Sequence, residues 1–124
     1  MNYIDLFITK YIKSFRKDRL IYEVNSKMKK ENFINHFCHE TLKYIEEKKI
    51  IFHGKKHECF EVLKSYNKEN FFVLSSFYID GIMMDLKELE LYMENEYMSI
   101  VAISDNIAII KEEEESLSNI FILK

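Results

Sequence analysis

Apolar side chains recur at helical spacing in the first 48 residues. In residues 3–17 they fall at i, i+3, i+4, i+7, i+8 and i+11, which predicts one helix with a single buried stripe. That stripe consists of Ile4, Phe7, Ile8, Tyr11, Ile12 and Phe15. Asn2 is the expected N-cap. Residues 30–48 repeat the pattern and predict a second helix, whereas residues 19–25 fit either a helix extension or a short strand.

Strand patterns dominate the later part of the chain. Residues 71–79 are rich in β-branched and aromatic side chains and end at Asp80-Gly81, which predicts a strand followed by a turn. A return strand is expected at residues 82–84. Residues 99–103 and 107–111 flank Ser104-Asp105-Asn106, the pattern of a hairpin. Residues 50–52 fit a strand or the exit of the preceding helix, and a last strand is expected at residues 120–123. Residues 58–66 favour a strand over a short helix.

One more helix is predicted between the late strands. Asp85 and Glu88 have the spacing of a capping box, and an apolar stripe follows over residues 86–97. We find no linker or repeat, so residues 1–124 are expected to form one domain. The fold class predicted is α+β: a single two-layer domain with N-terminal helices packed on a mainly antiparallel C-terminal sheet.

Composition narrows the range of functions. The chain has 124 residues, of which 48% are hydrophobic and 31% charged, so a folded domain is expected rather than a disordered chain. It contains two glycines and no proline, which excludes the glycine-rich loops that cradle phosphates in P-loop and dinucleotide-binding proteins. Asp5 and Lys10 interrupt the first apolar run, so no secretory signal is predicted, and a cytoplasmic location is expected.

Charge is distributed unevenly along the chain. Residues 1–79 contain 15 Lys/Arg and 10 Asp/Glu, a net charge of +5, whereas residues 80–124 contain 3 and 11, a net charge of −8. Potentials of neighbouring carboxylates add within a few Debye lengths of about 8 Å. An acidic surface attracts basic proteins, such as nucleases, and repels nucleic acid. The alternative is an ordinary solvated face that keeps the protein soluble.

These charges lead to a hypothesis of partner binding. The chain is predicted to be a non-enzymatic bacterial immunity or antitoxin-type protein that occludes a basic toxin, expected to be a nuclease, without a cofactor. Its general composition is similar to that of small Ile/Lys/Asn/Glu-rich bacterial proteins that neutralise a cognate toxin. Tyrosines among the acids fit an interface. The predicted partner-binding residues are Asp80, Asp85, Glu88, Glu90, Tyr92, Glu94, Glu96, Tyr97 and Asp105.

The alternative hypothesis is a small nucleic-acid-binding regulator that uses the lysine-rich first half. Its candidate residues are Lys10, Lys13, Lys17, Lys27, Lys29, Lys30, Lys48, Lys49, Lys55 and Lys56. Only two of the fifteen basic residues before residue 80 are arginines, the side chain best suited to base edges and bidentate phosphate contacts. The aromatic residues of the first helices fall on apolar stripes, where packing accounts for them. The acidic partner surface is therefore favoured.

Histidines and cysteines cluster without forming a recognisable site. They are His36, Cys38, His39, His53, His57 and Cys59. No CxxC pair is present, and Cys38 falls on the apolar stripe while His36 falls on another face, so neither a structural zinc site nor a catalytic thiol is predicted. The sequence leaves open whether these residues ever bind a metal. With only two cysteines, both are expected to be free thiols.

Overall fold

Six antiparallel strands form the centre of the molecule. A computed structural model describes residues 2–25, 34, 41–94, 98–112 and 119–124. The order of the strands across the sheet is β1-β6-β5-β4-β2-β3, so β1 and β3 are its two edges. The strands are β1 (Ile50–Gly54), β2 (Asn70–Ser75), β3 (Ile82–Asp85), β4 (Ile100–Ile103), β5 (Ala108–Lys111) and β6 (Ile120–Leu123).

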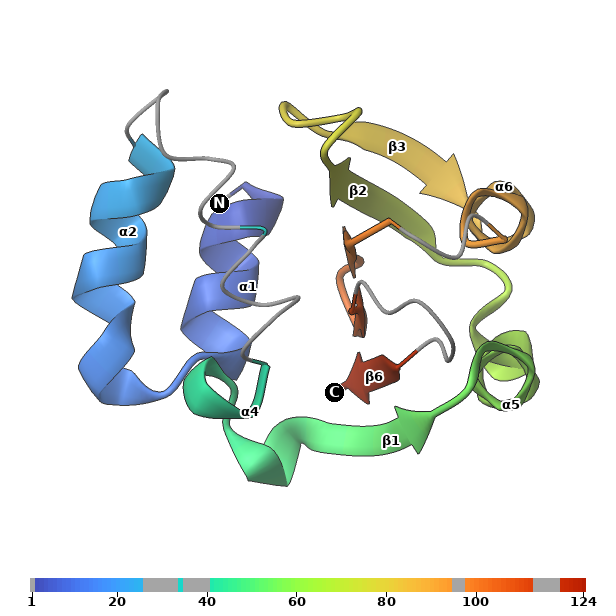
Figure 1. Cartoon of the computed structure of the whole chain (residues 1–124), viewed down its shortest axis with the longest axis horizontal. Helices are drawn as coiled ribbons and strands as arrows, with labels where there is room; N and C mark the ends of the chain where they lie inside the picture. The colour runs from blue at the N-terminus through green and yellow to red at the C-terminus, as the bar shows by residue number, and fades with distance from the viewer. Residues whose placement is uncertain (1, 26–33, 35–40, 95–97, 113–118) are drawn as a thin grey trace.

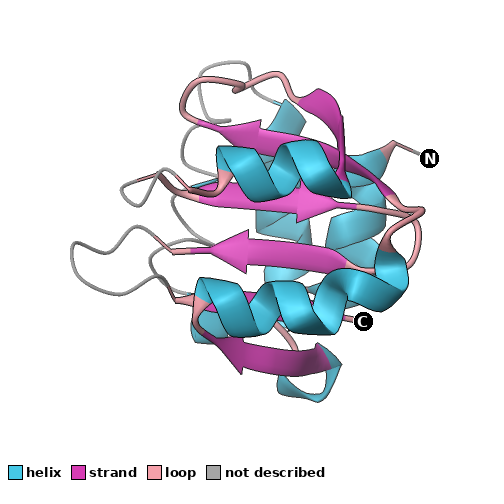
Figure 2. Ribbon diagram, turned by 90° about the vertical axis from the view of Figure 1, so that its right-hand side faces the viewer, coloured by secondary structure: helices cyan, strands magenta, loops and turns pink. Residues whose placement is uncertain are grey.

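Helices cover both faces of this sheet (Figure 1). One face carries α1 (Tyr3–Tyr11), α2 (Lys17–Asn25) and α4 (Thr41–Tyr44), and the other carries α5 (Lys56–Leu63) and α6 (Leu86–Tyr92). Figure 2 looks onto the second face, where α5 and α6 lie in front of the sheet and run roughly along the strands. Short 3-10 turns occupy Ser14–Arg16, Glu47–Lys49 and Lys64–Tyr66.

The α+β class and the packing of N-terminal helices on an antiparallel sheet are confirmed, but the domain has three layers where two were predicted. The physical reason lies in the central strands. Every residue of β4, β5 and β6 is buried, without the alternation of buried and exposed positions that a sheet open to water on one face shows. Such strands need a cover on each face, and α5 and α6 supply the second one.

The first helix begins as predicted and ends earlier. Asn2 is its N-cap, and the Asn2 Oδ1 accepts a hydrogen bond from the Asp5 backbone N–H at 2.8 Å. The helix stops at Tyr11 because Ile12 turns to extended backbone and forms an isolated bridge with Ile45. Phe15, predicted to lie on the buried stripe, is consequently 74% exposed. The ambiguous residues 19–25 belong to a second helix, α2.

The predicted helix over residues 30–48 is present in part. Among its described residues, Ile34 is helical and buried, and α4 covers Thr41–Tyr44. Ile45 leaves the helix for its bridge with Ile12, and a 3-10 turn follows at Glu47–Lys49. Residues 35–40, which include His36, Cys38 and His39, lie outside the described residues.

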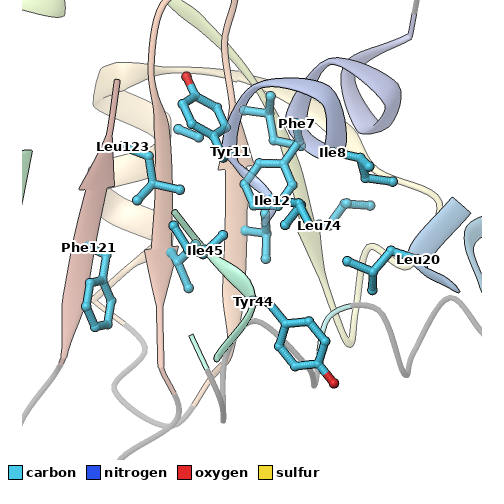
Figure 3. Close-up of a cluster of buried hydrophobic side chains, with 14 of the residues drawn as sticks. Phe7, Ile8, Tyr11, Ile12, Leu20, Tyr44, Ile45, Leu74, Phe121 and Leu123 are labelled. Carbon is cyan, nitrogen blue, oxygen red and sulfur yellow. The ribbon is translucent and has the colours of Figure 1, made fainter. Parts of the chain in front are cut away.

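The core beneath α1 contains a buried hydroxyl. Figure 3 shows Phe7, Tyr11 and Ile12 of the α1 segment against side chains from the sheet, among them Leu74 and Leu123. Tyr11 is fully buried, and its Oη has no hydrogen-bond partner among the described residues. Burial raises the pKa of Tyr11 to about 12. The hydroxyl therefore loses its water contacts on folding without gaining a protein contact.

We expect Tyr11→Phe to raise the free energy of unfolding by about 1 kcal/mol, because it removes a buried polar group that has no partner. Urea denaturation followed by circular dichroism measures the change. Tyr66→Phe is the matched control, since the Tyr66 hydroxyl accepts a hydrogen bond from the Lys124 ammonium at 3.0 Å. That control is expected to lose about 0.5 kcal/mol. A loss of stability in Tyr11→Phe would mean that its hydroxyl has a partner.

A second core lies under α5 and α6 and includes side chains from residues 58–66. These residues form α5 and a 3-10 turn, and the predicted strand is wrong. Cys59, Phe60 and Leu63 are buried at i, i+1 and i+4, which is the spacing of one helical face. They pack into a cluster with Phe71 of β2 and other residues of the sheet.

Candidate partner-binding surface

The N-terminus of α6 is fixed by two reciprocal hydrogen bonds. The Asp85 carboxylate accepts one from the Glu88 backbone N–H at 2.8 Å, and the Glu88 carboxylate accepts one from the Asp85 backbone N–H at 3.2 Å. This is the predicted capping box, and it is confirmed. Because Asp85 also ends β3, the capping box joins an edge strand directly to an acidic helix.

Four of the predicted partner-binding carboxylates come together around α6. Asp85 caps the helix, Glu88 and Glu90 lie within it, Glu94 follows its last turn, and all four are exposed. The described structure contains no ion pair between any of them and a basic side chain. α1, which carries Lys10, is on the opposite face of the sheet. Lys87 is the one basic residue in α6.

The remaining predicted acids lie elsewhere. Asp80 is exposed in the turn between β2 and β3, at the opposite end of β3 from Asp85. Asp105 is in the β4–β5 turn, at the same sheet end as Asp85 but two strands away from β3. The Asp105 backbone carbonyl accepts a hydrogen bond from the Lys10 ammonium at 3.3 Å. Glu96 and Tyr97 lie outside the described residues. The acidic surface is therefore centred on α6.

Tyr92 is held by the protein's own core. Its hydroxyl lies 2.6 Å from the Ser75 Oγ and donates to the Met98 sulfur at 2.7 Å. Burial raises the pKa of Tyr92, the Ser75 hydrogen bond opposes this rise, and Tyr78 adds to it. The Tyr78 and Tyr92 rings lie 5.5 Å apart. Tyr92 thus positions the end of α6 against the β2–β3 hairpin and leaves little of its ring for a partner.

Exposed apolar side chains accompany the α6 carboxylates. Leu91 of α6 is 62% exposed, and Phe77 of the β2–β3 turn is 76% exposed. Ile82 and Met83 of β3 are also exposed. We define the β3–α6 surface as Phe77, Ile82, Met83, Asp85, Glu88, Glu90, Leu91 and Glu94. Within it, Ile82 lies on the α6 face of the edge strand and Met83, opposite Phe72, lies on the other face. The apolar half of this surface was not predicted from the sequence, because it depends on the edge position of β3.

Lysines on the opposite helix layer are engaged with carbonyl groups. The Lys13 ammonium donates to the Leu42 carbonyl and the Lys17 ammonium donates to the Thr9 carbonyl, each at 3.0 Å. Together with the Lys10 contact, these bonds attach charged side chains to helix ends and loops. Such lysines stabilise the fold and are less available for phosphate groups than free lysines.

Histidine and cysteine side chains are separated in the described structure. Cys59 is fully buried in α5, and burial raises the pKa of its thiol to about 12. His57 is exposed on the same helix, while the His53 ring stacks on Phe121 and its Nε2 lies 2.8 Å from the Asn119 amide oxygen. No cluster of three or more metal-ligating side chains occurs among the described residues. Because its pKa is raised, the Cys59 thiol of the folded protein is protonated and unreactive at pH 8.

A shallow hollow of about 340 Å³ lies between α1 and α2. It is lined by Asp5, Ile8, Thr9 and Ile21. Among the described residues of this lining, Asp5 is the single titratable group, so they do not form the paired acid and base groups of a hydrolytic centre.

No known protein family, curated protein or solved structure matches this chain. Within the described ranges, no helix is both long enough and apolar enough to cross a lipid bilayer.

Proposed function

We propose that this chain is a non-enzymatic immunity or antitoxin-type protein of the bacterial cytoplasm. It binds a basic toxin, in the first instance a nuclease, through the β3–α6 surface and blocks the toxin's phosphate-binding surface by occupying it. The observation that carries the proposal is the set of four exposed carboxylates around α6 that form no ion pair within the described structure, adjacent to exposed apolar side chains.

Physical chemistry supports this combination of charged and apolar groups. Unpaired carboxylates on one helix produce an additive negative potential, which speeds the approach of a basic protein and repels nucleic acid. Leu91 and Phe77 provide apolar area that can be buried once the partner has docked. Nucleases must expose cations to hold phosphates, so they offer the complementary surface.

Reversing charge on α6 tests the proposal. Glu88→Lys combined with Glu90→Lys is expected to slow association with the captured partner about ten-fold at low salt, and the rate for the unchanged protein is expected to fall steeply as salt rises. Surface plasmon resonance between 50 and 500 mM NaCl measures both effects. The partner is captured from a native lysate at low salt and identified by mass spectrometry, and its nuclease activity is assayed with and without this protein.

The matched control reverses the same number of charges on α5, with Glu58→Lys and Glu61→Lys, because both carboxylates are exposed on the same face of the sheet. It is expected to leave the association rate within two-fold. The proposal fails if the α5 variant loses the partner while the α6 variant keeps it, or if the captured protein is acidic. Binding of generic RNA or DNA by the unchanged protein would favour the nucleic-acid hypothesis instead.

A further inference from the structure

The two edges of the sheet are built differently. β1 pairs with β6 through a register irregularity between Ile50 and Phe52, and lysines flank it at Lys48, Lys49 and Lys55. Bulges and lysines are the features by which natural proteins prevent further strands from pairing at an edge. β3 pairs with β2 in continuous register and contains neither lysine nor proline. Because Lys87 lies two residues beyond β3, the difference between the two edges is the register irregularity, which β3 lacks.

The backbone of β3 leaves hydrogen-bonding groups on its outer side. The Ser75 N–H donates to the Tyr78 carbonyl across the hairpin, so the N–H groups of alternate β2 residues, including Val73 and Phe71, also point toward β3. Met83, opposite Phe72, then belongs to a pair without mutual hydrogen bonds. The hydrogen bond of the Asp85 N–H is consistent with this assignment, because that N–H donates to the Glu88 carboxylate and not to β2. The Met83 N–H and C=O consequently face the open edge.

Side chains on both faces of this edge favour an apolar neighbour. Met83 is 47% exposed and Ile82 is 39% exposed. Because successive residues of a strand point to opposite faces, these two side chains would contact alternate residues of an added strand, one above the sheet and one below it. Main-chain hydrogen bonds would supply affinity, and these side-chain contacts would supply selectivity.

Charge restricts the occupant of the edge. Asp85 and Glu88 lie where β3 meets α6, so a strand running along β3 ends beside two carboxylates. A second copy paired through β3 about a two-fold axis at Met83 would run antiparallel, so Asp85 would lie opposite Gly81 and close to Asp80 of its neighbour, which brings carboxylates together. A second copy paired through its β1 edge would meet the irregularity at Ile50 and Phe52. A strand bearing lysine or arginine meets neither obstacle.

We propose that β3 accepts an extended, lysine- or arginine-containing segment of a basic partner protein as a seventh strand of the sheet. This inference rests on the proposed function, and it adds the mode of recognition: backbone pairing at β3 together with charge pairing at the α6 end. The occupied surface is continuous with the α6 carboxylates, so one partner segment can use both.

The probe is a fluorescein-labelled peptide of about eight alternating lysine and valine residues, and fluorescence anisotropy measures its binding. The same peptide with every backbone nitrogen methylated keeps its charge and side chains but cannot donate main-chain hydrogen bonds. We expect it to bind at least ten-fold more weakly. A peptide with glutamate in place of lysine is expected not to bind. Hydrogen exchange by NMR is expected to show slower exchange of the Met83 amide when the lysine peptide is bound.

Variants of the two edges test the location. Met83→Gln is expected to weaken binding of the lysine peptide about five-fold, because it replaces an apolar contact by a polar one. Ile51→Gln changes an exposed apolar residue of the β1 edge and is expected to leave binding unchanged. An unchanged Met83 amide exchange rate in the presence of saturating peptide would place binding away from β3 and overturn the inference.

Three further outcomes would overturn it: no binding of the lysine peptide, equal affinity for the methylated and unmethylated peptides, or a concentration-dependent dimer that Met83→Gln dissociates. The last would show that a second copy occupies the edge. Equal affinity for the two peptides, with partner capture still lost on α6 charge reversal, removes strand addition but leaves the proposed function. Peptide binding at β3, with partner capture unaffected by α6 charge reversal, removes the proposed function but leaves strand addition at β3.

Discussion

Replacement of Gly81 by alanine is expected to lower the free energy of unfolding by about 3 kcal/mol. Gly81 closes the turn that leads into β3: its N–H donates to the Tyr78 carbonyl at 3.0 Å, and its φ of +85° is a conformation that side chains with a Cβ disfavour. A Cβ at this position would also overlap the Phe72 ring, which stacks on Tyr3 at 5.6 Å. In Gly81→Ala, either the Phe72 ring or the backbone of the turn must therefore move.

Gly54→Ala is the matched control. The backbone of Gly54 does not have a positive φ, and an added Cβ would lie 2.9 Å from the end of the neighbouring Phe52 ring, which is able to rotate away. We expect a loss below about 1 kcal/mol there. Chemical denaturation of both variants provides the comparison. Equal losses at the two glycines would mean that neither the positive φ nor the Phe72 contact matters, and would contradict the hairpin geometry described for β2 and β3.

Local features of this fold were predictable because each depends on a few neighbouring residues. The capping box needs only an acid at Asp85 and a glutamate three residues later, and both hydrogen bonds form. The β4–β5 hairpin needs two apolar runs around a polar turn, and the strands pair as expected from Ile100↔Lys111 to Ile103↔Ala108. In each case the residues that decide the geometry are adjacent in the chain.

The third layer was not predicted because no single segment reveals it. Phe60 and Val62 favour strands by intrinsic propensity, and Lys55 provides no side-chain cap to mark the start of α5. Burial against β6 and β1 overrides that propensity. The sequences of three strands do indicate a third layer. β4, β5 and β6 are nearly uninterrupted apolar runs, a pattern typical of strands covered on both faces. Those runs require more helical cover than the N-terminal helices alone provide.

The candidate surface was predictable to the extent that it follows helical spacing. Asp85 and Glu88 share the capping box of α6, so their proximity depends only on their separation of three residues. Whether Asp105 joins them depends on strand order, and β4 is separated from β3 by β2. Met83 was not identified because its exposure follows from the edge position of β3, which requires the whole sheet.

The sorting of charge between layers also depends on the topology. α1 carries Lys10 on one face of the sheet, and α6 carries its carboxylates on the other, so the sheet separates the basic helix layer from the acidic helix. With the two placed on the same face, the carboxylates would have had nearby lysines and a weaker external field. The second helix layer, which the sequence did not reveal, therefore separates α6 from Lys10, although α5 in the same layer carries Lys56.

Stability at alkaline pH is expected to depend strongly on Cys59. Burial raises the pKa of this thiol from an ordinary value of 9.0 to about 12, so between these pH values the unfolded chain releases a proton that the folded chain retains. The contribution of the thiol to stability is complete below pH 9 and is lost as the pH rises toward 12. At pH 10.5 the loss amounts to about 2 kcal/mol.

Comparison with Cys59→Ala isolates this effect, since every other side chain is the same in both proteins. At pH 7 the variant is expected to be less stable by about 1–2 kcal/mol, because it leaves a small cavity beside Phe60 and Leu63. At pH 10.5 that deficit is expected to shrink to about zero, since alanine has no proton to lose. Urea denaturation at the two pH values gives the difference directly. A deficit that stays constant from pH 7 to 10.5 would mean that the folded protein admits the thiolate, and the thiol would then be reactive enough to reopen the question of nucleophilic chemistry at α5.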